Sequence, residues 1–594
     1  MKGSWFSMLE IEHHKNIERV CLTILFGVGL LRLINLGFLD LQAWDEALYA
    51  VRAEGILLFG GLIDQTPFSI GGLYSSLHPP LYIWLTSLSF VIFGVTEFAA
   101  RLVSAVFGAL TLVVIYQLGK ELKNAAVGFV AALLFGLNPF VTFLARQGQF
   151  DTTMVFFLSV AALWFLKTDA KGKTLPAVYS GLAVGAALMT KLFVGFGIPL
   201  TFFLWKVFHP GERVFPWRLF FVSIGAMVLV AVPWHAYMTV VRGFGNPIFL
   251  LDASAVLERS LYGVEGNVKS LEWFYFVNQL LVLFPLGLFW FAFGIYEIFK
   301  NRDRQWSFPA LWFLVFFVVF SLMRTKLSVY VLPMLVPASL IGAKAIMEFA
   351  QDDRPAKMTA LLLGATGLAF LWSSSQAWRN QTKAILTDIL QAHAPSSSIL
   401  LSIAPFAILF VLIAFLSFLI YRNDLIRPMR QVLPLALIAP AFLMSFYNII
   451  GYDLHQYNDG AADLAGFIAR KQPAGIVVVG FDRNPQLTFY LEGADIGWRN
   501  DIEVRRIAPP AHRAEFRSWL SEQVSDLPSE TLVIVEKDKI VRYEWVTTEE
   551  STPTDFIMVF DSRRYAVFQR PLTSQLATLN PRGLLSPTRS FGKE

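Results

Sequence analysis

The chain has 594 residues, of which 55% are hydrophobic and only 16% are charged, and its mean hydropathy is +0.54. Soluble domains carry about 25% charged residues, so this composition excludes an ordinary soluble enzyme and indicates a polytopic membrane protein. The net charge of +5 is small for this length and gives no sign of nucleic-acid binding. Cys21 is the single cysteine, which excludes a disulfide within the chain, and the first residues predict no cleaved signal peptide.

Apolar runs long enough to cross a hydrocarbon layer of about 30 Å recur between residues 20 and 450 and predict about thirteen membrane-spanning helices. The expected spans are Val20–Leu36, Leu102–Leu118, Ala125–Leu144, Thr152–Leu166, Leu175–Met189, Leu192–Trp205, Leu219–Trp234, Trp273–Phe299, Phe308–Leu322, Val329–Ala345, Met358–Trp372, Ile399–Ile420 and Val432–Ile450. The run Leu81–Val95 is shorter and follows two prolines, which is typical of an interfacial or re-entrant segment.

The distribution of Lys and Arg indicates on which side Leu81–Val95 lies. With a cytoplasmic N-terminus and this run kept outside, the short cytoplasmic loops hold the excess of basic residues, such as Lys120 with Lys123. If the run crossed the membrane, every later loop would change sides and the bias would invert. We therefore expect it outside, and the following polar residues then share the outer side: Asp45, Glu46, His78, Asp151, Lys191, Arg259, Lys326 and Tyr330.

The composition changes after Ile450, since residues 451–594 are charged and contain no apolar run of spanning length. We expect buried strands at Gly475–Gly480, Thr531–Glu536, Phe556–Phe560 and Tyr565–Gln569, and amphipathic helices at Asp459–Lys471 and Ala511–Gln523. The sequence thus predicts a mainly α protein in two parts. Residues 1–450 form a polytopic membrane helical bundle whose first outer loop is 38–101, and residues 451–594 form a soluble, extracytoplasmic α/β domain.

Charged residues at the outer ends of the predicted spans are the candidates for chemistry. Asp45 and Glu46 follow the first span, where they either solvate its end or face a substrate at the edge of the bundle. Asp151 fits both a helix N-cap and a substrate contact. Lys191 interrupts two apolar runs, so its ammonium either reaches the membrane surface or binds an anion. Lys326 and Tyr330 are four apart, which predicts one helical face.

Three motifs of the first outer loop resemble the GT-C glycosyltransferases, in the branch of the bacterial aminoarabinose transferases and the protein O-mannosyltransferases. They are Trp44-Asp45-Glu46-Ala47-Leu48-Tyr49-Ala50, His78-Pro79-Pro80-Leu81-Tyr82 and Glu97-Phe98-Ala99-Ala100-Arg101-Leu102. The resemblance covers about residues 20–350. It implies a GT-C type bundle in the inner (plasma) membrane that moves a sugar from a polyprenyl-phosphate donor to a lipid, glycan or protein acceptor, with its active site on the periplasmic side.

The resemblance also implies roles for individual residues. Asp45 is the expected general base, and Glu46 and Asp151 are further acids of the catalytic site. The donor phosphate is assigned to the residues Lys191, Arg259, Lys326 and Tyr330, of which Arg259 aligns most loosely. Ser328 replaces a proline of the family pattern around Lys326.

His78 and Tyr82 are assigned to substrate binding by the same resemblance. Leu77 and His78 stand where the aminoarabinose transferases have an acid and a lysine, and His-Pro-Pro-Leu is closer to the O-mannosyltransferase pattern. A lone histidine is more often structural than a metal ligand. We therefore expect no metal site and no cofactor.

Two other function classes fit a polytopic membrane protein. A transporter or lipid flippase would place polar groups near the middle of the bilayer, often on broken helices in repeated halves. The polar residues here lie at span ends on one side, and the sequence shows no repeat. A catalytically inactive scaffold that binds through its outer α/β domain is the third interpretation, and retention of both acids and both lysines favours the enzyme over it.

Overall fold

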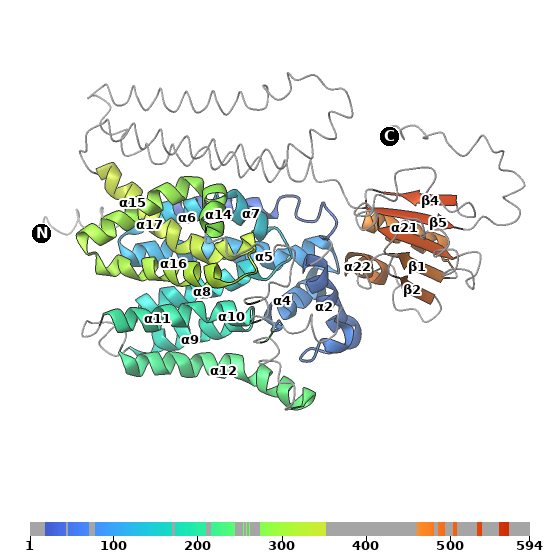
Figure 1. The fold of residues 1–594 in the computed structure, drawn as a ribbon, viewed down its shortest axis with the longest axis horizontal. Helices are drawn as coiled ribbons and strands as arrows, with labels where there is room; N and C mark the ends of the chain where they lie inside the picture. Colours follow the sequence, from blue (N-terminus) through green and yellow to red (C-terminus); the bar gives the residue numbers. More distant parts are fainter. Residues whose placement is uncertain are drawn as a thin grey trace, which may run out of the picture.

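The computed structural model describes residues 18–42, 45–69, 78–168, 173–209, 216–243, 254, 257, 261, 274–351, 460–473, 475–479, 485–493, 503–507, 531–536, 557–562 and 564–569. Arg259, the last three predicted spans and the predicted helix Ala511–Gln523 lie outside these ranges. Figure 1 shows a bundle of helices beside a sheet formed by the end of the chain.

The bundle begins with a helix from 18 to 30 and a short 3-10 helix, η1 (Leu31–Leu33). Next come α2 (Asp45–Phe59), η2 (Thr66–Phe68) and α4 (Leu81–Phe93). The remaining helices are α5 (Glu97–Leu122), α6 (Ala125–Gly136), α7 (Pro139–Ala145), α8 (Asp151–Leu166), α9 (Thr174–Leu188), α10 (Leu192–Gly195), α11 (Gly197–Phe208), α12 (Trp217–Arg242), α14 (Tyr275–Leu283), α15 (Pro285–Asn301), α16 (Arg304–Leu322), η3 (Ser328–Val331) and α17 (Leu332–Gln351).

Four helical segments of the described chain are long and apolar enough to cross a membrane: α5, α12, α16 and Ser328–Glu348. The pair α6 and α7 makes a fifth if it counts as one span, although it bends by 70°. The helices α4, α8, α9 and Leu192–Phe208 are apolar but shorter. A multi-pass membrane protein is confirmed, whereas the number of thirteen spans stays a prediction.

Several predicted spans are broken, and local sequence explains each break. The side chain of Asn138 accepts a hydrogen bond from the Val141 amide, and Pro139 takes the first position of α7. Asn and Pro are favoured at these two positions because they satisfy or remove free amides. Pro285 starts α15 in the same way, which divides the predicted span Trp273–Phe299 after α14. Both prolines therefore divide runs that are continuous in hydropathy into two helices.

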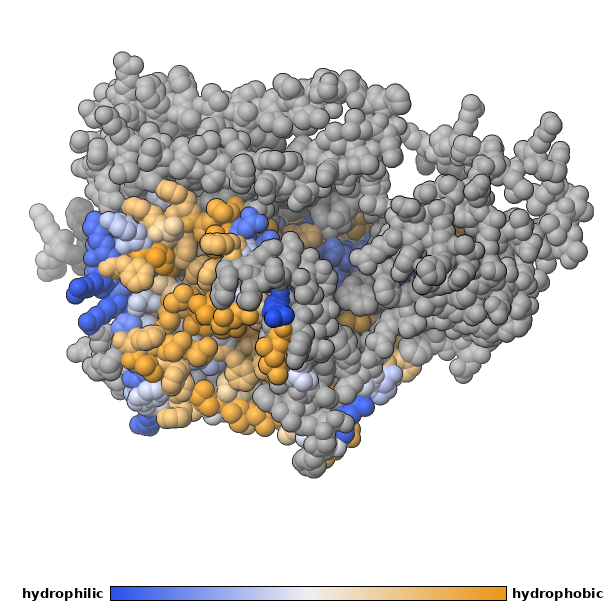
Figure 2. Space-filling view, in the orientation of Figure 1, coloured by the Kyte–Doolittle hydropathy of each residue, from blue (hydrophilic) through white to orange (hydrophobic). Residues whose placement is uncertain are grey.

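Hydrophobic side chains cover the visible face of the bundle, and hydrophilic residues gather at its left end (Figure 2). On α12 the exposed apolar residues include Val228, Leu229 and Val240. A surface of this kind is stable in hydrocarbon and unstable in water. Lys123, Lys344 and Glu348 form an ion-paired cluster. This cluster ties α5 to α17 at the ends of those helices away from Glu97 and Leu332.

The end of the chain forms a five-stranded sheet in the order β2-β1-β3-β5-β4. Its strands are β1 (Gly475–Val479), β2 (Glu503–Ile507), β3 (Leu532–Glu536), β4 (Ile557–Asp561) and β5 (Tyr565–Gln569). The β1 strand pairs in parallel with β2 and β3, and β5 pairs antiparallel with β3 and β4. Two helices accompany it, α21 (Ala461–Lys471) and α22 (Pro485–Gly493), and α22 lies beside α2 (Figure 1).

Close approach of α5 to α6 depends on two glycines. A methyl group at Gly128 would lie 2.1 Å from the carbonyl oxygen of Tyr116, and one at Gly119 would lie 2.4 Å from the Cα of Gly128. Small residues at such positions let two backbones pack directly against each other within a membrane. This contact holds α5 against α6 near the Leu122 end of α5, which is the end away from Arg101.

Gly128→Ala is expected to separate α5 from α6 and to destabilise the protein. Overpacking of this kind costs about 1–3 kcal/mol or more, because the opposing group is backbone and cannot rotate away. The matched control is Gly225→Ala on α12, where an added methyl group meets nothing within 4 Å. Thermal unfolding of the purified proteins in detergent checks this prediction, and equal midpoints for the two variants would contradict it.

Candidate functional site

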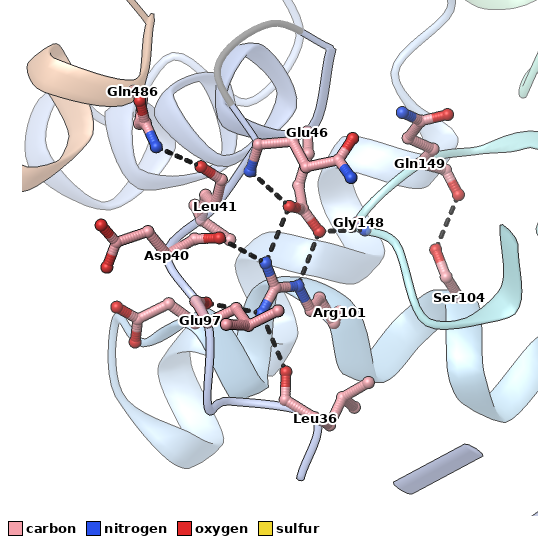
Figure 3. A network of polar contacts seen from close by, with 12 residues as sticks. Leu36, Asp40, Leu41, Glu46, Glu97, Arg101, Ser104, Gly148, Gln149 and Gln486 are labelled. Carbon is pink, nitrogen blue, oxygen red and sulfur yellow. Dashed lines mark hydrogen bonds and ion pairs between the residues drawn. The ribbon is translucent and has the colours of Figure 1, made fainter. Parts of the chain in front are cut away.

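A buried ion pair joins the first turn of α2 to the first turns of α5 (Figure 3). The Glu46 carboxylate accepts from Arg101 Nε at 2.7 Å and from Arg101 Nη2 at 2.9 Å. It also accepts from the backbone amides of Gly148 and Gln42, each at 2.6 Å. The Glu46 side chain is 0% exposed and that of Arg101 is 7% exposed. The two carboxylate oxygens of Glu46 thus accept hydrogen bonds from four donors, which indicates a structural role for this side chain.

Arg101 also gathers the chain segment that leads into α2. Its Nη1 donates to the carbonyls of Leu36 and Leu39, at 3.0 and 2.8 Å, and its Nη2 donates to the carbonyl of Asp40 at 2.8 Å. A guanidinium presents its donors in a fixed planar fork, so these contacts fix direction as well as distance. The position of Asp45, the first residue of α2, follows from this arrangement.

Asp45 is exposed, in contrast to its neighbour Glu46. It is an acid in the first turn of a helix, where the helix dipole favours a negative charge. Adjacent residues of a helix point about 100° apart, so two neighbouring carboxylates reach different surroundings. The sequence placed both acids in the catalytic site, and the structure gives them different environments.

A second pair of opposite charges meets where α8 begins and just after α9 ends. Lys191 Nζ lies 3.0 Å from Asp151 Oδ1, across 40 residues of chain. Burial lowers the pKa of Lys191, but the charge of Asp151, with a smaller contribution from Asp45, holds that pKa above its ordinary value. Lys191 is therefore a cation that Asp151 holds in the break between α9 and α10. The negative charge of Asp45 also stabilises the protonated ammonium of Lys191.

Aromatic rings surround this cation. Lys191 Nζ lies 4.7 Å from the centre of the Phe150 ring and 5.6 Å from the centre of the Tyr330 ring. Phe150 also contacts the rings of His78 at 5.1 Å and Tyr49 at 4.8 Å. The aromatic faces attract the ammonium and exclude water from it. Phe150 was not among the predicted site residues, although its position directly before Asp151 was a usable signal.

Tyr82 of α4 packs against Phe150, one of the aromatic rings beside Lys191. Its ring lies edge-on to Phe150 at 6.4 Å, and its hydroxyl is 3.0 Å from Ser104 Oγ. Ser104 in turn donates to the Gln149 carbonyl at 2.6 Å (Figure 3). Tyr82 is fully buried. It therefore supports the segment that carries Phe150 and Asp151.

The predicted helical face of Lys326 and Tyr330 is wrong. Lys326 precedes η3, and extended backbone at Leu327 separates it from that helix. Lys326 is 1% exposed, and its ammonium donates to the carbonyls of Ser321 and Met323, at 2.9 and 2.8 Å. These carbonyls end α16, where a cation is favoured. Tyr330 stacks on Phe320 instead and turns its ring toward Lys191.

The described residues contain no group of three or more His, Cys, Asp or Glu side chains that could hold a metal ion. Arg259, the remaining predicted phosphate ligand, lies outside the described ranges. The structure thus brings together Asp45, Asp151, Lys191 and Tyr330 with the His78 ring nearby.

Comparisons with known proteins agree with the resemblance seen in the motifs. Residues 77–237 match the family described as dolichyl-phosphate-mannose-protein mannosyltransferase. An uncharacterized protein of Aquifex aeolicus is 26% identical over 364 residues, which are 59% of this chain and 67% of that protein. The undecaprenyl phosphate-alpha-4-amino-4-deoxy-L-arabinose arabinosyl transferase 2 of Proteus mirabilis is 29% identical over 329 residues, which are 53% of this chain and 57% of that transferase. The match thus spans little more than half of the Proteus protein.

Solved structures share the fold. ArnT from Cupriavidus metallidurans bound to undecaprenyl phosphate superposes with a TM-score of 0.61 at 18% identity, over 93% of this chain and 98% of that chain. The apo oligosaccharyltransferase of Archaeoglobus fulgidus gives a TM-score of 0.51 at 13% identity, over 90% of this chain and 70% of that chain. The resemblance to the GT-C membrane glycosyltransferases, in the branch of the aminoarabinose transferases and protein O-mannosyltransferases, is confirmed.

Glu46→Gln is expected to destabilise the protein strongly. The substitution keeps the shape of the side chain but leaves the Arg101 charge buried without its partner, which costs about 3–5 kcal/mol. The matched control is Glu18→Gln, because Glu18 pairs with Lys120 at 2.6 Å in side chains that are 33% and 41% exposed. An exposed pair contributes about 0–1 kcal/mol. Unfolding midpoints in detergent test the difference, and an equally small loss in both variants would contradict it.

Proposed function

We propose that this protein is an integral membrane glycosyltransferase that moves a sugar from a polyprenyl-phosphate donor to an acceptor outside the cytoplasm. The observation that carries the proposal is the cluster of Asp45, Asp151 and Lys191 at the ends of apolar helices. It combines a base and a fixed cation at the point where a lipid-borne phosphate would leave the hydrocarbon. The acceptor class, whether lipid, glycan or protein, stays open.

In the proposed reaction Asp45 removes a proton from the acceptor's nucleophilic group. That group then attacks the anomeric carbon of the sugar and forms the new glycosidic bond with inversion. The bond between this carbon and the phosphate oxygen breaks, and its electron pair leaves with the polyprenyl phosphate. Asp45 suits the role because it is exposed, in a turn whose position the Glu46–Arg101 pair fixes.

Lys191 is proposed to hold the donor phosphate. The phosphodiester gains negative charge as it leaves as a monoester, so a fixed cation stabilises the transition state more than the ground state. Asp151 keeps Lys191 charged and directs its ammonium at 3.0 Å. The Phe150 and Tyr330 rings limit access of water, which strengthens the attraction.

The other predicted residues receive narrower roles in this proposal. Glu46 positions Asp45 and does not touch substrate. Tyr82 positions the Phe150 segment, and His78 contributes the outer wall of the substrate site through its ring. Lys326 is proposed as a second phosphate ligand, although its ammonium also ends α16. Arg259 is proposed as a third ligand of the donor phosphate.

The proposed orientation places this cluster and the C-terminal sheet on the periplasmic side of an inner membrane. The ion-paired cluster of Lys123, Lys344 and Glu348 then faces the cytoplasm, as the excess of basic residues there requires. A donor that is soluble in the membrane reaches the cluster laterally from the bilayer, so the protein does not need a nucleotide-sugar site on the cytoplasmic side.

Asp45→Asn is expected to lower kcat by roughly 10²–10⁴-fold, which is the usual contribution of a general base, while the fold and donor binding stay intact. The matched control is Asp463→Asn, since Asp463 is also an exposed acid in the first turn of a helix but lies on α21. Turnover of a polyprenyl-phosphate sugar by the purified variants gives the answer. Wild-type turnover in Asp45→Asn would remove Asp45 from the reaction.

Lys191→Ala and Lys326→Ala are each expected to lower kcat and to raise KM for the polyprenyl donor. If both bind one phosphate, the double variant loses less than the sum of the single losses in free energy. Lys206→Ala is the control, because Lys206 lies over the Trp217 ring, away from the proposed site, and should leave the kinetics unchanged. A Lys326→Ala variant with reduced stability but normal donor kinetics would restrict Lys326 to its role at the end of α16.

A further inference from the structure

Helix α22 of the C-terminal part binds both backbone polar groups of a single residue, Leu41, in the segment that precedes α2. The Leu41 amide donates to the Tyr490 hydroxyl at 2.8 Å, and the Leu41 carbonyl accepts from Gln486 Nε2 at 2.7 Å. Gln486 and Tyr490 are four residues apart, so they extend from one face of the helix. Leu41 and Gln486 are fully buried. Two side chains thus hold both polar groups of one residue.

Helix α22 makes further contacts with α4, α5 and β5 around Leu41. The Tyr490 hydroxyl donates to Glu97 at 3.0 Å, in the first turn of α5. Tyr565 of β5 donates to Gln486 Oε1 at 2.9 Å, which connects the grip to the sheet. Phe489 packs against Phe90 of α4 at 6.3 Å between ring centres. The C-terminal part is therefore attached to the outer loop by buried, directional contacts as well as by packing.

Asp40 adds a second attachment one residue earlier. Its side chain accepts from the amides of Gly460 and Ala461 at the start of α21, at 3.1 and 2.9 Å. Its main-chain carbonyl accepts from Arg101 on the opposite side. The segment 39–42 is thus held between two groups of donors and acceptors, Arg101 with Glu46 on one side and α21 with α22 on the other. Figure 3 shows the contacts of Arg101, Glu46 and Gln486 with this segment.

We propose that Gln486 and Tyr490 are positioning residues for the transfer reaction, which hold Leu41 so that the first turn of α2 presents Asp45 to the acceptor beside Lys191. This inference rests on the proposed function, since it concerns the geometry of the same site. Neither residue touches substrate. In this proposal the C-terminal part contributes to the transfer reaction by positioning Asp45.

The two halves of the site depend on different parts of the chain. Lys191, Asp151 and Phe150 are held by α8, α9 and the segment between α7 and α8, and none of their contacts described above involves α22. Loss of the grip on Leu41 therefore displaces Asp45 while the proposed phosphate site stays in place. A displacement of about 1 Å in a reacting group lowers rates by up to about 100-fold. The effect falls on kcat, and KM for the donor stays unchanged.

The test compares Tyr490→Phe with wild type in full-length protein, with a polyprenyl-phosphate sugar as donor. Tyr490→Phe keeps the ring and its packing but removes the hydroxyl from Leu41 and Glu97. We expect kcat to fall by roughly 10- to 100-fold with KM for the donor unchanged. Gln486→Met is the second variant, because it removes the other half of the grip and should give the same split between kcat and KM.

The matched control is Tyr179→Phe, which removes a hydroxyl from an exposed tyrosine on α9 and should keep wild-type kinetics. Asp45→Asn is measured in the same assay. If Asp45→Asn is inactive while folded Tyr490→Phe and Gln486→Met turn over normally, the positioning role is wrong and the proposed function stands. A fall in kcat accompanied by an equal loss of donor binding would also overturn the positioning role. An active Asp45→Asn would overturn the proposed function itself.

Discussion

The pairing of Glu46 with Arg101 is the interaction on which the proposed active site depends. Its two side chains come from helices 55 residues apart in the chain, and they are almost wholly excluded from water. A buried charge pair is stable only when its remaining donors and acceptors are satisfied, and here backbone groups of two further segments, residues 36–42 and the segment at Gly148, satisfy them. Those segments lead into α2, into α8 and away from η1. The same pair that neutralises two charges therefore also fixes the start of α2, where Asp45 lies, and it accepts a hydrogen bond from the Gly148 amide.

The packing of the bundle helices supports this ion pair, and the ends of those helices carry the residues of the proposed active site. Glycine contacts bring α5 and α6 together, and the predicted apolar runs are divided into separate helices at Pro139, Pro285 and Lys191. The charged side chains of the proposed site lie at helix ends, where partners of opposite charge or backbone groups satisfy them. A transporter would need such groups near the middle of the membrane. A donor anchored in the bilayer needs them at its edge, which is where the proposed function assigns the helix ends that carry these residues.

Much of the arrangement could be predicted from the sequence, and the limits have physical causes. Hydropathy predicted the membrane protein, and motif resemblance selected Asp45, Asp151 and Lys191, of which Lys191 and Asp151 form an ion pair. Apolar runs do not show breaks, so Ala125–Leu144 became one span although Pro139 starts a new helix. Spacing of four predicted one helical face for Lys326 and Tyr330, but extended backbone at Leu327 intervenes. The different environments of Asp45 and Glu46 depend on Arg101 and Gly148, which are distant in sequence. The grip of α22 on Leu41 has no local signal at all, because it joins residues more than 400 positions apart.

The most direct test of the account is mass spectrometry of envelope lipids, glycans and glycoproteins from cells that lack the gene, complemented with the wild-type protein or with Asp45→Asn. The account predicts a sugar-modified acceptor that disappears without the gene, returns with the wild type and stays absent with Asp45→Asn, while the polyprenyl-phosphate sugar accumulates. An unchanged set of glycosylated molecules in the cells without the gene, or full restoration by Asp45→Asn, would contradict it.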